Sequence, residues 1–430
     1  MRIAVVGLGK IGLPLAVQFA EKGHVVIGCD VNADTVNMVN NATAPFPGEA
    51  FLDEKLDKVV KNGSLTATTD TTVAVSQCDA VVIVVPLFVD AQGTPDFGWM
   101  DDATRHVGRG LKSNTIVSYE TTLPVGTTRN RFAPLLEHGS GLTAGKDFSL
   151  VFSPERVLTG RVFADLRKYP KLVGGLTQEC TKNGVDFYNK VLDFDVRDDL
   201  PCPNGVWDLG SCEASEMAKL AETTYRDVNI GLANQFARFA DLHNIDIYGV
   251  IDACNSQPYS HIHQPGIAVG GHCIPIYPQM YVWNDPAATV VLAARAANAA
   301  MPNYAINLLE RHHGNLKDQR IAVFGASYRG GVKETAFSGV FDTVTALLEK
   351  GAVVQVHDPM YSDDELVALG FSPYHYNQPL DAAVIQADHD EYRLLDEAKI
   401  GGARTILNGR NIRFEHTLKH VIAIGSQVGV

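Results

Sequence analysis

The feature that most constrains the fold is a glycine-rich turn at the start of the chain. Residues 2–6 (RIAVV) form an apolar run typical of a buried strand, and the sequence GLGKIG follows it at once. Gly7, Gly9 and Gly12 have the G-x-G-x-x-G spacing, and a helical pattern then continues to about Lys22. In such a motif the first glycine permits a tight turn, the second lets a ligand approach the backbone, and the third lets the helix pack on the strand. The pattern predicts a strand–turn–helix unit of an α/β domain.

The second strand-like run points to a dinucleotide ligand. Residues 24–30 (HVVIGCD) end at Asp30, 18 residues after Gly12. A carboxylate at this position can accept hydrogen bonds from ribose hydroxyls and would repel a 2′-phosphate, while the phosphates lie at the helix N-terminus. The pattern therefore favours NAD over NADP. A glycine turn in an α/β domain without a ligand is the alternative.

Strand-like and helical patterns alternate along most of the chain. Apolar runs at 80–86 (AVVIVVP) and 115–120 (TIVSYE) are separated by helical segments, which is typical of a parallel sheet covered on both faces. The pattern restarts at 320–324 with IAVFGASYRGG, and AVVQVHDP at 352–359 again ends a strand-like run with an acidic residue. We therefore expect the α/β fold class with two Rossmann-like parallel-sheet domains.

A helical region separates these two domains. Residues 211–243 contain no proline and keep a helical apolar rhythm, which predicts a helix of about 45–50 Å that could act as a spine between domains or subunits. Further helical patterns continue to about Leu309. We expect an NAD-binding domain over 1–204, a central helical and dimerisation domain over 205–310, and a second Rossmann-like domain over 318–430.

Composition excludes several classes of function. A net charge of −13, from 49 acidic and 36 basic residues, argues against a nucleic-acid-binding surface. The sequence has no run of 18 consecutive apolar residues, so we expect no membrane span. The N-terminal residues form a strand-like run and show no signal-peptide pattern. The seven cysteines form no C-x-x-C pair, which fits reduced thiols. We expect a cytoplasmic protein with no membrane or nucleic-acid partner.

One cysteine lies in an unusual setting. In GIAVGGHCIPIYP (266–278), Cys273 follows Gly270, Gly271 and His272. Nearby glycines can expose backbone N–H groups, which lower a thiol pKa and stabilise an oxyanion. In a chain that binds NAD, this arrangement suggests oxidation through a thiohemiacetal and a thioester. A metal site at His261, His263, His272 and Cys273 lacks the spacing of known zinc motifs, so we expect no metal.

Two charged residues and a second glycine cluster are further candidates. Glu155 lies in FSPER after a strand-like run, and Lys219 lies within EMAKLAETTYR with Thr223 and Arg226 near the same helical face. Taken alone, each charge is better explained by a solvated surface position. The loop Gly325–Gly331 (GASYRGG) lacks the G-x-G-x-x-G spacing; it either holds a diphosphate or is a structural loop.

Seven stretches occur together in an order that resembles the nucleotide-sugar 6-dehydrogenases, the UDP-glucose/GDP-mannose dehydrogenase family, over nearly the whole chain. They are VVGLGKIGLPLA, VVPLFVDAQGTPDF, ETTLPVGTT, FSPERV with its later KLVGG, EMAKLAETTYRDVNI, GIAVGGHCIPIYP and VFGASYRG. The resemblance implies a four-electron oxidation in which a UDP-sugar, two NAD⁺ and water give a UDP-uronate and two NADH. It also implies a homodimer built on the long helix.

The resemblance also implies roles for particular residues. Cys273 would be the nucleophile, Lys219 would stabilise the oxyanion, and Glu155 with Thr122 would activate and order the hydrolytic water. Thr223 stands one turn after the lysine and completes the catalytic set. The NAD-binding residues would be Gly7, Gly9, Lys10, Ile11, Gly12, Asp30, Pro86, Thr122 and Glu155. The residues binding the UDP-sugar would be Lys219, Arg226, Gly270, Gly271, Tyr328 and Arg329.

Three positions depart from the family pattern. Thr223 replaces an asparagine, Tyr277 replaces an aspartate four residues after the cysteine, and Ala336 replaces an arginine of the C-terminal motif. The GGHC form and TYRDVNI resemble the branch that acts on UDP-N-acetylhexosamines (N-acetylmannosamine or N-acetylglucosamine). UDP-glucose is the alternative substrate.

Two other functions remain as hypotheses. A two-electron β-hydroxyacid dehydrogenase also combines a Rossmann domain with a long helix bearing a lysine, but it needs neither Cys273 nor a second α/β domain. A catalytically silent nucleotide-sugar-binding protein would fit the loss of the usual asparagine and aspartate. The number of NADH formed per UDP-sugar separates the three: two, one or none.

Overall fold

The chain forms two compact units. The computed structural model describes residues 1–90 and 92–426. The first unit contains Met1–Glu222 and the short segment Gln279–Asn284; the second contains Thr223–Pro278 and the chain that follows from Asp285. The division falls within the long helix α9 (Cys212–His243). The bounds of α9 confirm the helix expected at 211–243.

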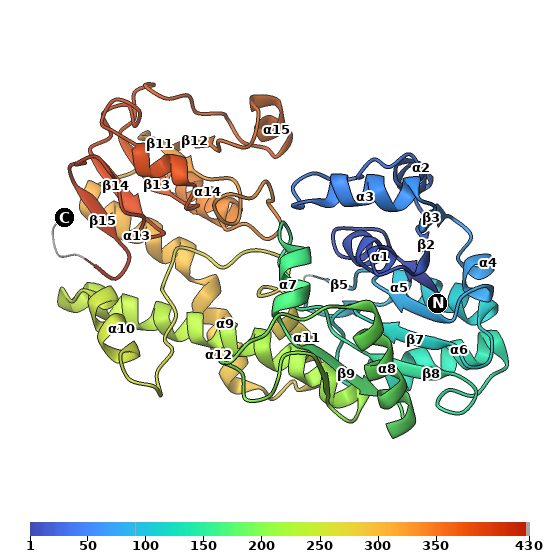
Figure 1. Ribbon diagram of the computed structural model, residues 1–430. Coiled ribbons are helices and arrows are strands. Elements are labelled where there is room, and N and C mark those ends of the chain that lie inside the picture. Colours follow the sequence, from blue (N-terminus) through green and yellow to red (C-terminus); the bar gives the residue numbers. More distant parts are fainter. Residues whose placement is uncertain (91, 427–430) are drawn as a thin grey trace. The chain divides into compact units, whose positions relative to one another are not determined.

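An eight-stranded sheet forms the centre of the first unit (Figure 1). Its spatial order is β10-β9-β8-β7-β4-β1-β2-β3. The strands are β1 (Arg2–Val6), β2 (Val25–Cys29), β3 (Leu65–Thr68), β4 (Ala80–Ile83), β7 (Ile116–Tyr119), β8 (Ser149–Phe152), β9 (Lys171–Gly175) and β10 (Val206–Asp208). The six strands from β8 to β3 are parallel, which confirms the expected Rossmann-like sheet.

The remaining two strands run the other way. β9 pairs antiparallel with β8, and β10 pairs parallel with β9. The segment between β8 and β9 leaves and rejoins the sheet at the same edge, so the chain must reverse its direction there. As a consequence, the first residue of β9 lies at the edge where β7 and β8 end.

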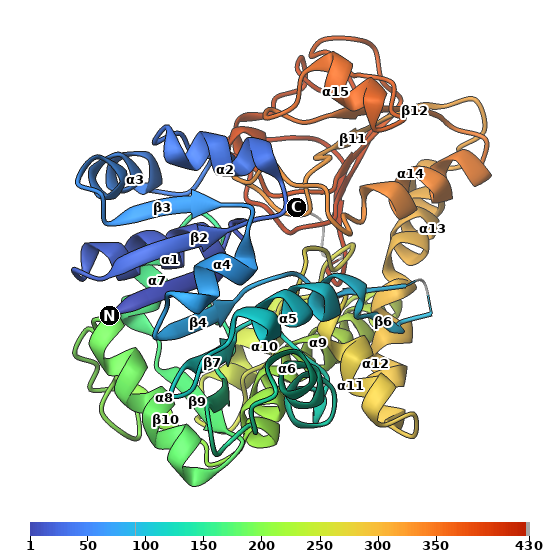
Figure 2. The same ribbon diagram turned by 90° about the vertical axis from the view of Figure 1, so that its right-hand side faces the viewer.

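Helices cover both faces of this sheet. Side chains of α1, α3, α7 and α8 join the strands in one apolar core, while α4, α5 and α6 lie next to one another (Figure 2). The helices are α1 (Gly12–Glu21), α2 (Ala33–Asn40), α3 (Leu52–Lys61), α4 (Thr71–Ser76), α5 (Gly98–Gly110), α6 (Ala133–Ser140), α7 (Val162–Lys168) and α8 (Gln178–Val191). A π-helical turn η1 (Thr128–Phe132), a ribbon of β5 (Phe88–Val89) and β6 (Pro95–Asp96), and most of α11 (Tyr277–Asn284) complete the unit.

The second unit contains a smaller parallel sheet. Its order is β12-β11-β13-β14-β15, and every neighbouring pair is parallel. The strands are β11 (Arg320–Phe324), β12 (Val353–His357), β13 (Ala382–Ile385), β14 (Thr405–Asn408) and β15 (Val421–Ala423). This sheet confirms the second Rossmann-like element of the expected fold.

Helices pack on one face of the second sheet. Apolar residues of α13 and α14 join those of α9, α10 and the strands in one core, whereas η2 and loops cover the other face. The helices are α10 (Ile247–Asn255), α12 (Thr289–Ala299), α13 (Met301–His313), α14 (Val340–Glu349), α15 (Asp363–Ala368) and the 3₁₀ turn η2 (Asp390–Leu394). Within the described residues, no helix has the length and apolar character needed to cross a membrane.

Candidate active site

The residues expected to bind NAD gather at one edge of the first sheet. They follow the carboxyl ends of β1, β2, β4, β7 and β8, which are neighbours in the sheet. In parallel sheets this edge is where ligands bind, because the connecting loops there leave a crevice. The strand order therefore brings Gly7, Asp30, Pro86, Thr122 and Glu155 to a common edge.

The N-terminal turn has the local structure that a pyrophosphate requires. Gly7 has φ of +95°, and a methyl group added to Gly12 would lie 1.8 Å from the Gly7 carbonyl oxygen. At Gly9, by contrast, a methyl group would meet nothing within 4 Å, so the fold leaves open space there. Helix α1 has no side-chain hydrogen bond at its N-cap, Ile11, so no side chain caps the N-terminus at which a phosphate would bind. These features fit NAD.

Asp30 is tied to the same turn. Its two carboxylate oxygens accept hydrogen bonds from the backbone N–H groups of Leu8 (2.8 Å) and Asn32 (2.9 Å). Each oxygen keeps a further lone pair that can accept from a ribose hydroxyl. The turn and Asp30 are thus held in a fixed geometry, with Lys10 exposed beside them.

Glu155 is not a solvated surface carboxylate. Its side chain is 12% exposed, and Lys171 Nζ donates to it at 3.1 Å. The same ammonium donates to Glu120 at 2.6 Å, and Glu120 is fully buried. The Arg156 backbone N–H donates to the other Glu155 oxygen at 2.7 Å. Lys171 therefore lies between two carboxyl groups.

This cluster changes the pKa of each member. Burial raises the pKa of Glu120 to about 7, against the partial effect of Lys171, and the neighbouring Glu155 raises it further. Burial alone would also raise the pKa of Glu155, but Lys171 and the hydrogen bonds from Glu120 and the Arg156 N–H hold it below its usual value. Burial opposes the charge on Lys171, yet the two carboxyl groups outweigh it and raise the lysine pKa.

Helix α9 carries the next two candidates. Lys219 and Thr223 are buried, whereas Arg226 is exposed. Arg156, next to Glu155, donates from Nε to Glu222 of α9 at 2.9 Å. In the first unit, the FSPER loop and the helical turn after Lys219 are therefore in direct contact.

The cysteine loop is packed against the C-terminal glycine loop of the second unit. Cys273 is partly buried, and its carbonyl oxygen accepts from the Tyr277 N–H at 2.9 Å as α11 begins. The Gly271 N–H donates to the Ala336 carbonyl at 3.0 Å. Beside this contact, His272 Nε2 lies 3.4 Å from Glu334. Backbone and side-chain contacts thus join the loop of Cys273 to the segment 334–336.

The structure gives Gly270 and Gly271 a packing role. A methyl group at Gly270 would lie 2.6 Å from Tyr328 Cβ and 2.8 Å from the Phe337 carbonyl oxygen. Gly271 has φ of +91°, and a methyl group there would lie 3.0 Å from the Tyr328 ring. We expected these glycines to offer backbone N–H groups to an oxyanion. At Gly271 this expectation is wrong, because its N–H already donates to the Ala336 carbonyl.

Tyr328 and Arg329 lie together on the other side of this contact. Arg329 Nε donates to the Tyr328 hydroxyl at 3.2 Å, and the half-buried Arg410 donates to the Tyr328 carbonyl at 2.8 Å. Four of the residues expected to bind substrate, Gly270, Gly271, Tyr328 and Arg329, therefore form one cluster with the cysteine loop.

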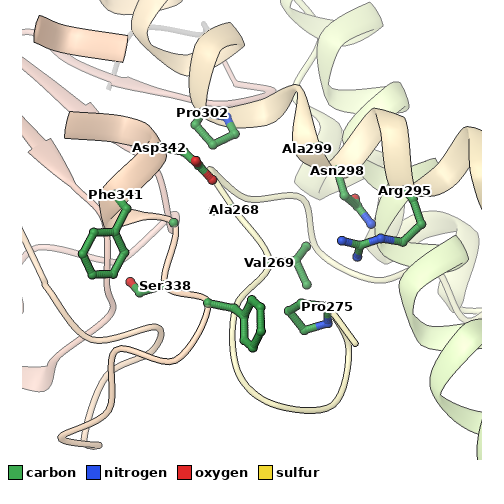
Figure 3. Close-up of a pocket in the computed structure, with 12 residues that line it drawn as sticks. Ala268, Val269, Pro275, Arg295, Asn298, Ala299, Pro302, Ser338, Phe341 and Asp342 are labelled. Atoms are coloured by element: carbon green, nitrogen blue, oxygen red, sulfur yellow. The ribbon is translucent and has the colours of Figure 1, made fainter. Parts of the chain in front are cut away.

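A cavity of about 290 Å³ lies beside the cysteine loop (Figure 3). Arg295 and Asn298 project from the same helix on one side, and Ser338 and Phe341 lie on the opposite side. Its lining consists of Ala268, Val269, Pro275, Arg295, Asn298, Ala299, Pro302, Phe337, Ser338, Gly339, Phe341 and Asp342. No residue that the sequence assigned to the site lines this cavity. Across residues 1–90 and 92–426, no group of three His, Cys, Asp or Glu residues is placed to hold a metal ion.

Sequence reasoning did not identify Glu120 and Lys171. Glu120 follows a buried strand, and Lys171 opens the otherwise apolar strand KLVGG. A charge at the end of a fully apolar strand is a signal for a buried ion pair, since isolated buried charges are costly. The pairing itself depends on the antiparallel direction of β9, which the local pattern does not reveal.

Comparisons with known proteins match the chain along its length. Models of the UDP-glucose/GDP-mannose dehydrogenase family match in three parts: the NAD binding domain over residues 1–192, the central domain over 213–302 and the UDP binding domain over 322–414. The UDP-N-acetyl-D-mannosamine dehydrogenase of Pyrococcus horikoshii is 33% identical, covering 96% of each chain. The NDP-N-acetyl-D-galactosaminuronic acid dehydrogenase of Ralstonia solanacearum is 30% identical, covering 95% of this chain and 96% of the relative.

Solved structures give the same relationship. The UDP-D-ManNAc dehydrogenase from Pyrococcus horikoshii has a TM-score of 0.87 at 30% identity and covers 99% of both chains. A UDP-glucose dehydrogenase from the archaeon Pyrobaculum islandicum has the same TM-score at 25% identity, covering 99% of this chain and 98% of that one. Fold similarity alone therefore does not discriminate between the two sugars.

Proposed function

Because the chain belongs to the UDP-glucose/GDP-mannose dehydrogenase family, we propose that it oxidises C6 of a UDP-N-acetylhexosamine, with UDP-N-acetylmannosamine as the first candidate. The chain is an NAD-dependent UDP-sugar 6-dehydrogenase, and the proposal concerns its sugar and its mechanism. The choice of sugar is supported by the near full-length similarity to dehydrogenases named for UDP-N-acetyl-D-mannosamine and for NDP-N-acetyl-D-galactosaminuronic acid, both of which are N-acetylated sugars.

The roles of the units follow from their loops. The N-terminal turn and Asp30 bind NAD, which accepts the hydride from C6 when bound. The cluster of Tyr328 and Arg329 in the C-terminal region binds the UDP half, since Arg329 supplies a cation for the diphosphate. We assign residues 1–204 to NAD binding, 205–310 to the catalytic lysine and cysteine, and 318–430 to UDP binding.

The second half of the reaction uses covalent chemistry at Cys273. Its sulfur adds to the C6 aldehyde to form a thiohemiacetal, whose oxidation gives a thioester. Lys219 stabilises the negative charge that develops on the sugar oxygen. Glu155, kept as a carboxylate by Lys171, accepts a proton from the water that hydrolyses the thioester, and Thr122 orders that water. This pathway accounts for two NADH per sugar.

The long helix supports a homodimer. Tyr225, Leu232, Phe236 and Phe239 recur at helical spacing on one face of α9, and each is at least 37% exposed. A stripe of large apolar side chains on a helix of this length is typical of a protein interface. We propose a second copy of this chain as its occupant, in line with the dimer that the family resemblance implies.

A substrate screen with product stoichiometry tests the proposed reaction. UDP-N-acetylmannosamine, UDP-N-acetylglucosamine and UDP-glucose are each supplied with excess NAD⁺, and NADH and uronate are quantified. We expect two NADH per sugar consumed and the highest kcat/KM with an N-acetylhexosamine. One NADH per sugar would support a two-electron dehydrogenase, and a preference for UDP-glucose would contradict the proposed sugar.

A cysteine variant tests the covalent mechanism. We expect Cys273→Ser to lose turnover by on the order of 10³-fold or more, because the nucleophile is removed. Cys202→Ser is the matched control, since Cys202 is exposed and lies outside the site, and it should keep wild-type turnover. Full activity of the Cys273 variant would exclude the thioester.

A further inference from the structure

Glu155 is one member of a buried group of three charges. Lys171 Nζ lies 2.6 Å from Glu120 and 3.1 Å from Glu155, so one ammonium serves two carboxyl groups. The Tyr188 hydroxyl donates to the other Glu120 oxygen at 2.6 Å and is 2.7 Å from Ser118 Oγ. The ammonium also lies 5.0 Å from the centre of the Tyr188 ring. Every polar atom that holds Glu120 is thus provided by the protein.

The three groups come together because of the sheet topology. Glu120 directly follows β7, Glu155 follows β8, and Lys171 begins β9. Since β9 is antiparallel to β8, its first residue lies at the edge where the other two strands end. Lys171 thus lies in the sheet itself, Glu120 lies one residue beyond it, where its N–H donates to the Ile83 carbonyl at 3.0 Å, and Glu155 lies on the following loop.

The charge balance makes this group suited to handling a proton. With all three members ionised, two carboxylates face one ammonium in a buried setting, which leaves one uncompensated negative charge. One of the two carboxylates therefore readily accepts a proton. Glu120 takes most of it, because the pKa of that carboxyl is raised to about 7 while the pKa of Glu155 is lowered. A hydrogen bond between the two carboxyl groups joins them.

We propose that Lys171 and Glu120 are positioning residues that keep Glu155 ionised as the base and receive, through it, the proton released in thioester hydrolysis. The inference rests on the proposed function, which makes Glu155 the base. Water adds its oxygen to the thioester carbon and gives one proton to Glu155. The C–S bond breaks with its electron pair on Cys273 Sγ, and the other water proton neutralises the sulfur. The proton on Glu155 passes to Glu120 and then leaves to solvent.

Other charged groups near Glu155 have partners of their own. Arg156 is paired with Glu222 of α9, and Asp165 of α7 is paired with Arg161. Tyr169 lines a small cavity together with Glu155, Asp165 and Lys171. Lys171 gives Glu155 a side-chain cation in hydrogen-bond contact, at 3.1 Å. Burial raises the pKa of Glu155, and Lys171 and Glu120 oppose that effect, so the charge state of Glu155 depends on both of these residues.

The pH dependence of turnover tests this inference. In Lys171→Met, burial and the charge of Glu120 would raise the Glu155 pKa, so the acidic limb of the kcat profile should move up by at least one pH unit. In Glu120→Gln the like charge is removed and Lys171 pairs with Glu155 alone, so the limb should stay or move down. In the double variant the limb should return toward the wild-type position. Lys171→Arg should keep the wild-type limb, and it serves as the second variant if Lys171→Met does not fold.

A matched control and a substrate-free measurement separate this inference from a purely structural role. Glu222→Gln changes a carboxylate beside the same loop but outside the group, so its acidic limb should be unchanged. Infrared titration of the free protein should show carboxyl absorption that titrates near pH 7, from Glu120 and from the separate Glu216, and Glu120→Gln should lose the Glu120 part of it. An unshifted limb in Lys171→Met with equal loss of turnover at every pH, or the same carboxyl titration in Glu120→Gln as in wild type, would overturn the inference.

The proposed function can fail separately. If Glu155→Gln turned over normally, or the sugar gave a single NADH, the assignment of Glu155 as the base would be wrong whatever the infrared titration showed. If Glu155→Gln accumulated thioester while Lys171→Met left the acidic limb in place, only the further inference would be wrong.

Discussion

Of the three glycines in the N-terminal turn, Gly9 is the one that the fold would allow to carry a side chain. Gly7 needs its positive φ, and Gly12 lets α1 pack against the Gly7 carbonyl, whereas the space beside Gly9 is open. One motif thus combines two glycines needed for folding with one needed for the ligand. This distinction appears only when the neighbours of each position are known.

Alanine variants of these glycines should separate binding from stability. Gly9→Ala should leave the free energy of unfolding within about 0.5–1 kcal/mol of wild type, because its methyl group meets no atom within 4 Å. Its affinity for NAD should fall at least tenfold, since the methyl group occupies space meant for the pyrophosphate. Gly12→Ala should destabilise the protein by several kcal/mol through the 1.8 Å clash. Denaturant unfolding and calorimetric NAD titration check both, and normal NAD binding by Gly9→Ala would contradict the assignment.

At the scale of elements, the carboxylate of Glu216 anchors α9 to the segment after β7. Glu216 is fully buried and accepts hydrogen bonds from the Gly126 N–H (2.6 Å), the Thr128 N–H (2.9 Å) and Thr128 Oγ1 (2.7 Å). Burial raises the Glu216 pKa to about 7, against the effect of these donors. This contact fixes the first turns of α9 relative to the segment that carries Thr122.

Removal of this carboxylate should destabilise the first unit. Glu216→Ala leaves three buried donors without an acceptor, which should lower the free energy of unfolding by about 3 kcal/mol or more. Glu213→Ala, one turn earlier on the same helix, breaks only a partly exposed pair with Arg129 and should cost less than about 1 kcal/mol. Urea unfolding of both variants gives the comparison, and similar losses would refute an anchoring role for Glu216.

At the scale of the whole molecule, the proposed dimer depends on the apolar stripe on α9. Phe239 is 56% exposed and lies against the His243 ring in a tilted arrangement, with ring centroids 4.3 Å apart. A net charge of −13 disfavours non-specific association, so a stable dimer needs a specific apolar contact.

A charge placed on the stripe should break the proposed dimer. Phe239→Glu should shift the protein from dimer to monomer in light scattering, because a carboxylate would be buried without a partner. Leu348→Glu is the matched control, since Leu348 on α14 is also 56% exposed and lies outside the stripe. The control should remain dimeric. A wild-type monomer, or a Phe239 variant that stays dimeric, would contradict the proposed interface.

The sequence by itself determined the features that depend on neighbouring residues. Apolar runs followed by glycines specified the strands and turns at 2–12 and 320–331, and the proline-free rhythm at 211–243 specified α9 nearly to the residue. Seven ordered motifs then indicated the family, because each combines residue types whose chemistry is local. The candidate nucleophile, base and lysine could be named in the same way.

Only the tertiary structure decided which groups surround those residues. Glu120, Glu155 and Lys171 are separated by 35 and 16 positions. The parallel pairing of β7 with β8 and the reversed direction of β9 bring them together. Likewise, Gly270 and Gly271 read as space for a substrate, yet their closest neighbours are Tyr328 and the backbone near Phe337. The physical reason is that backbone propensity and periodicity act over a few residues, whereas strand direction and packing are fixed by contacts between distant segments.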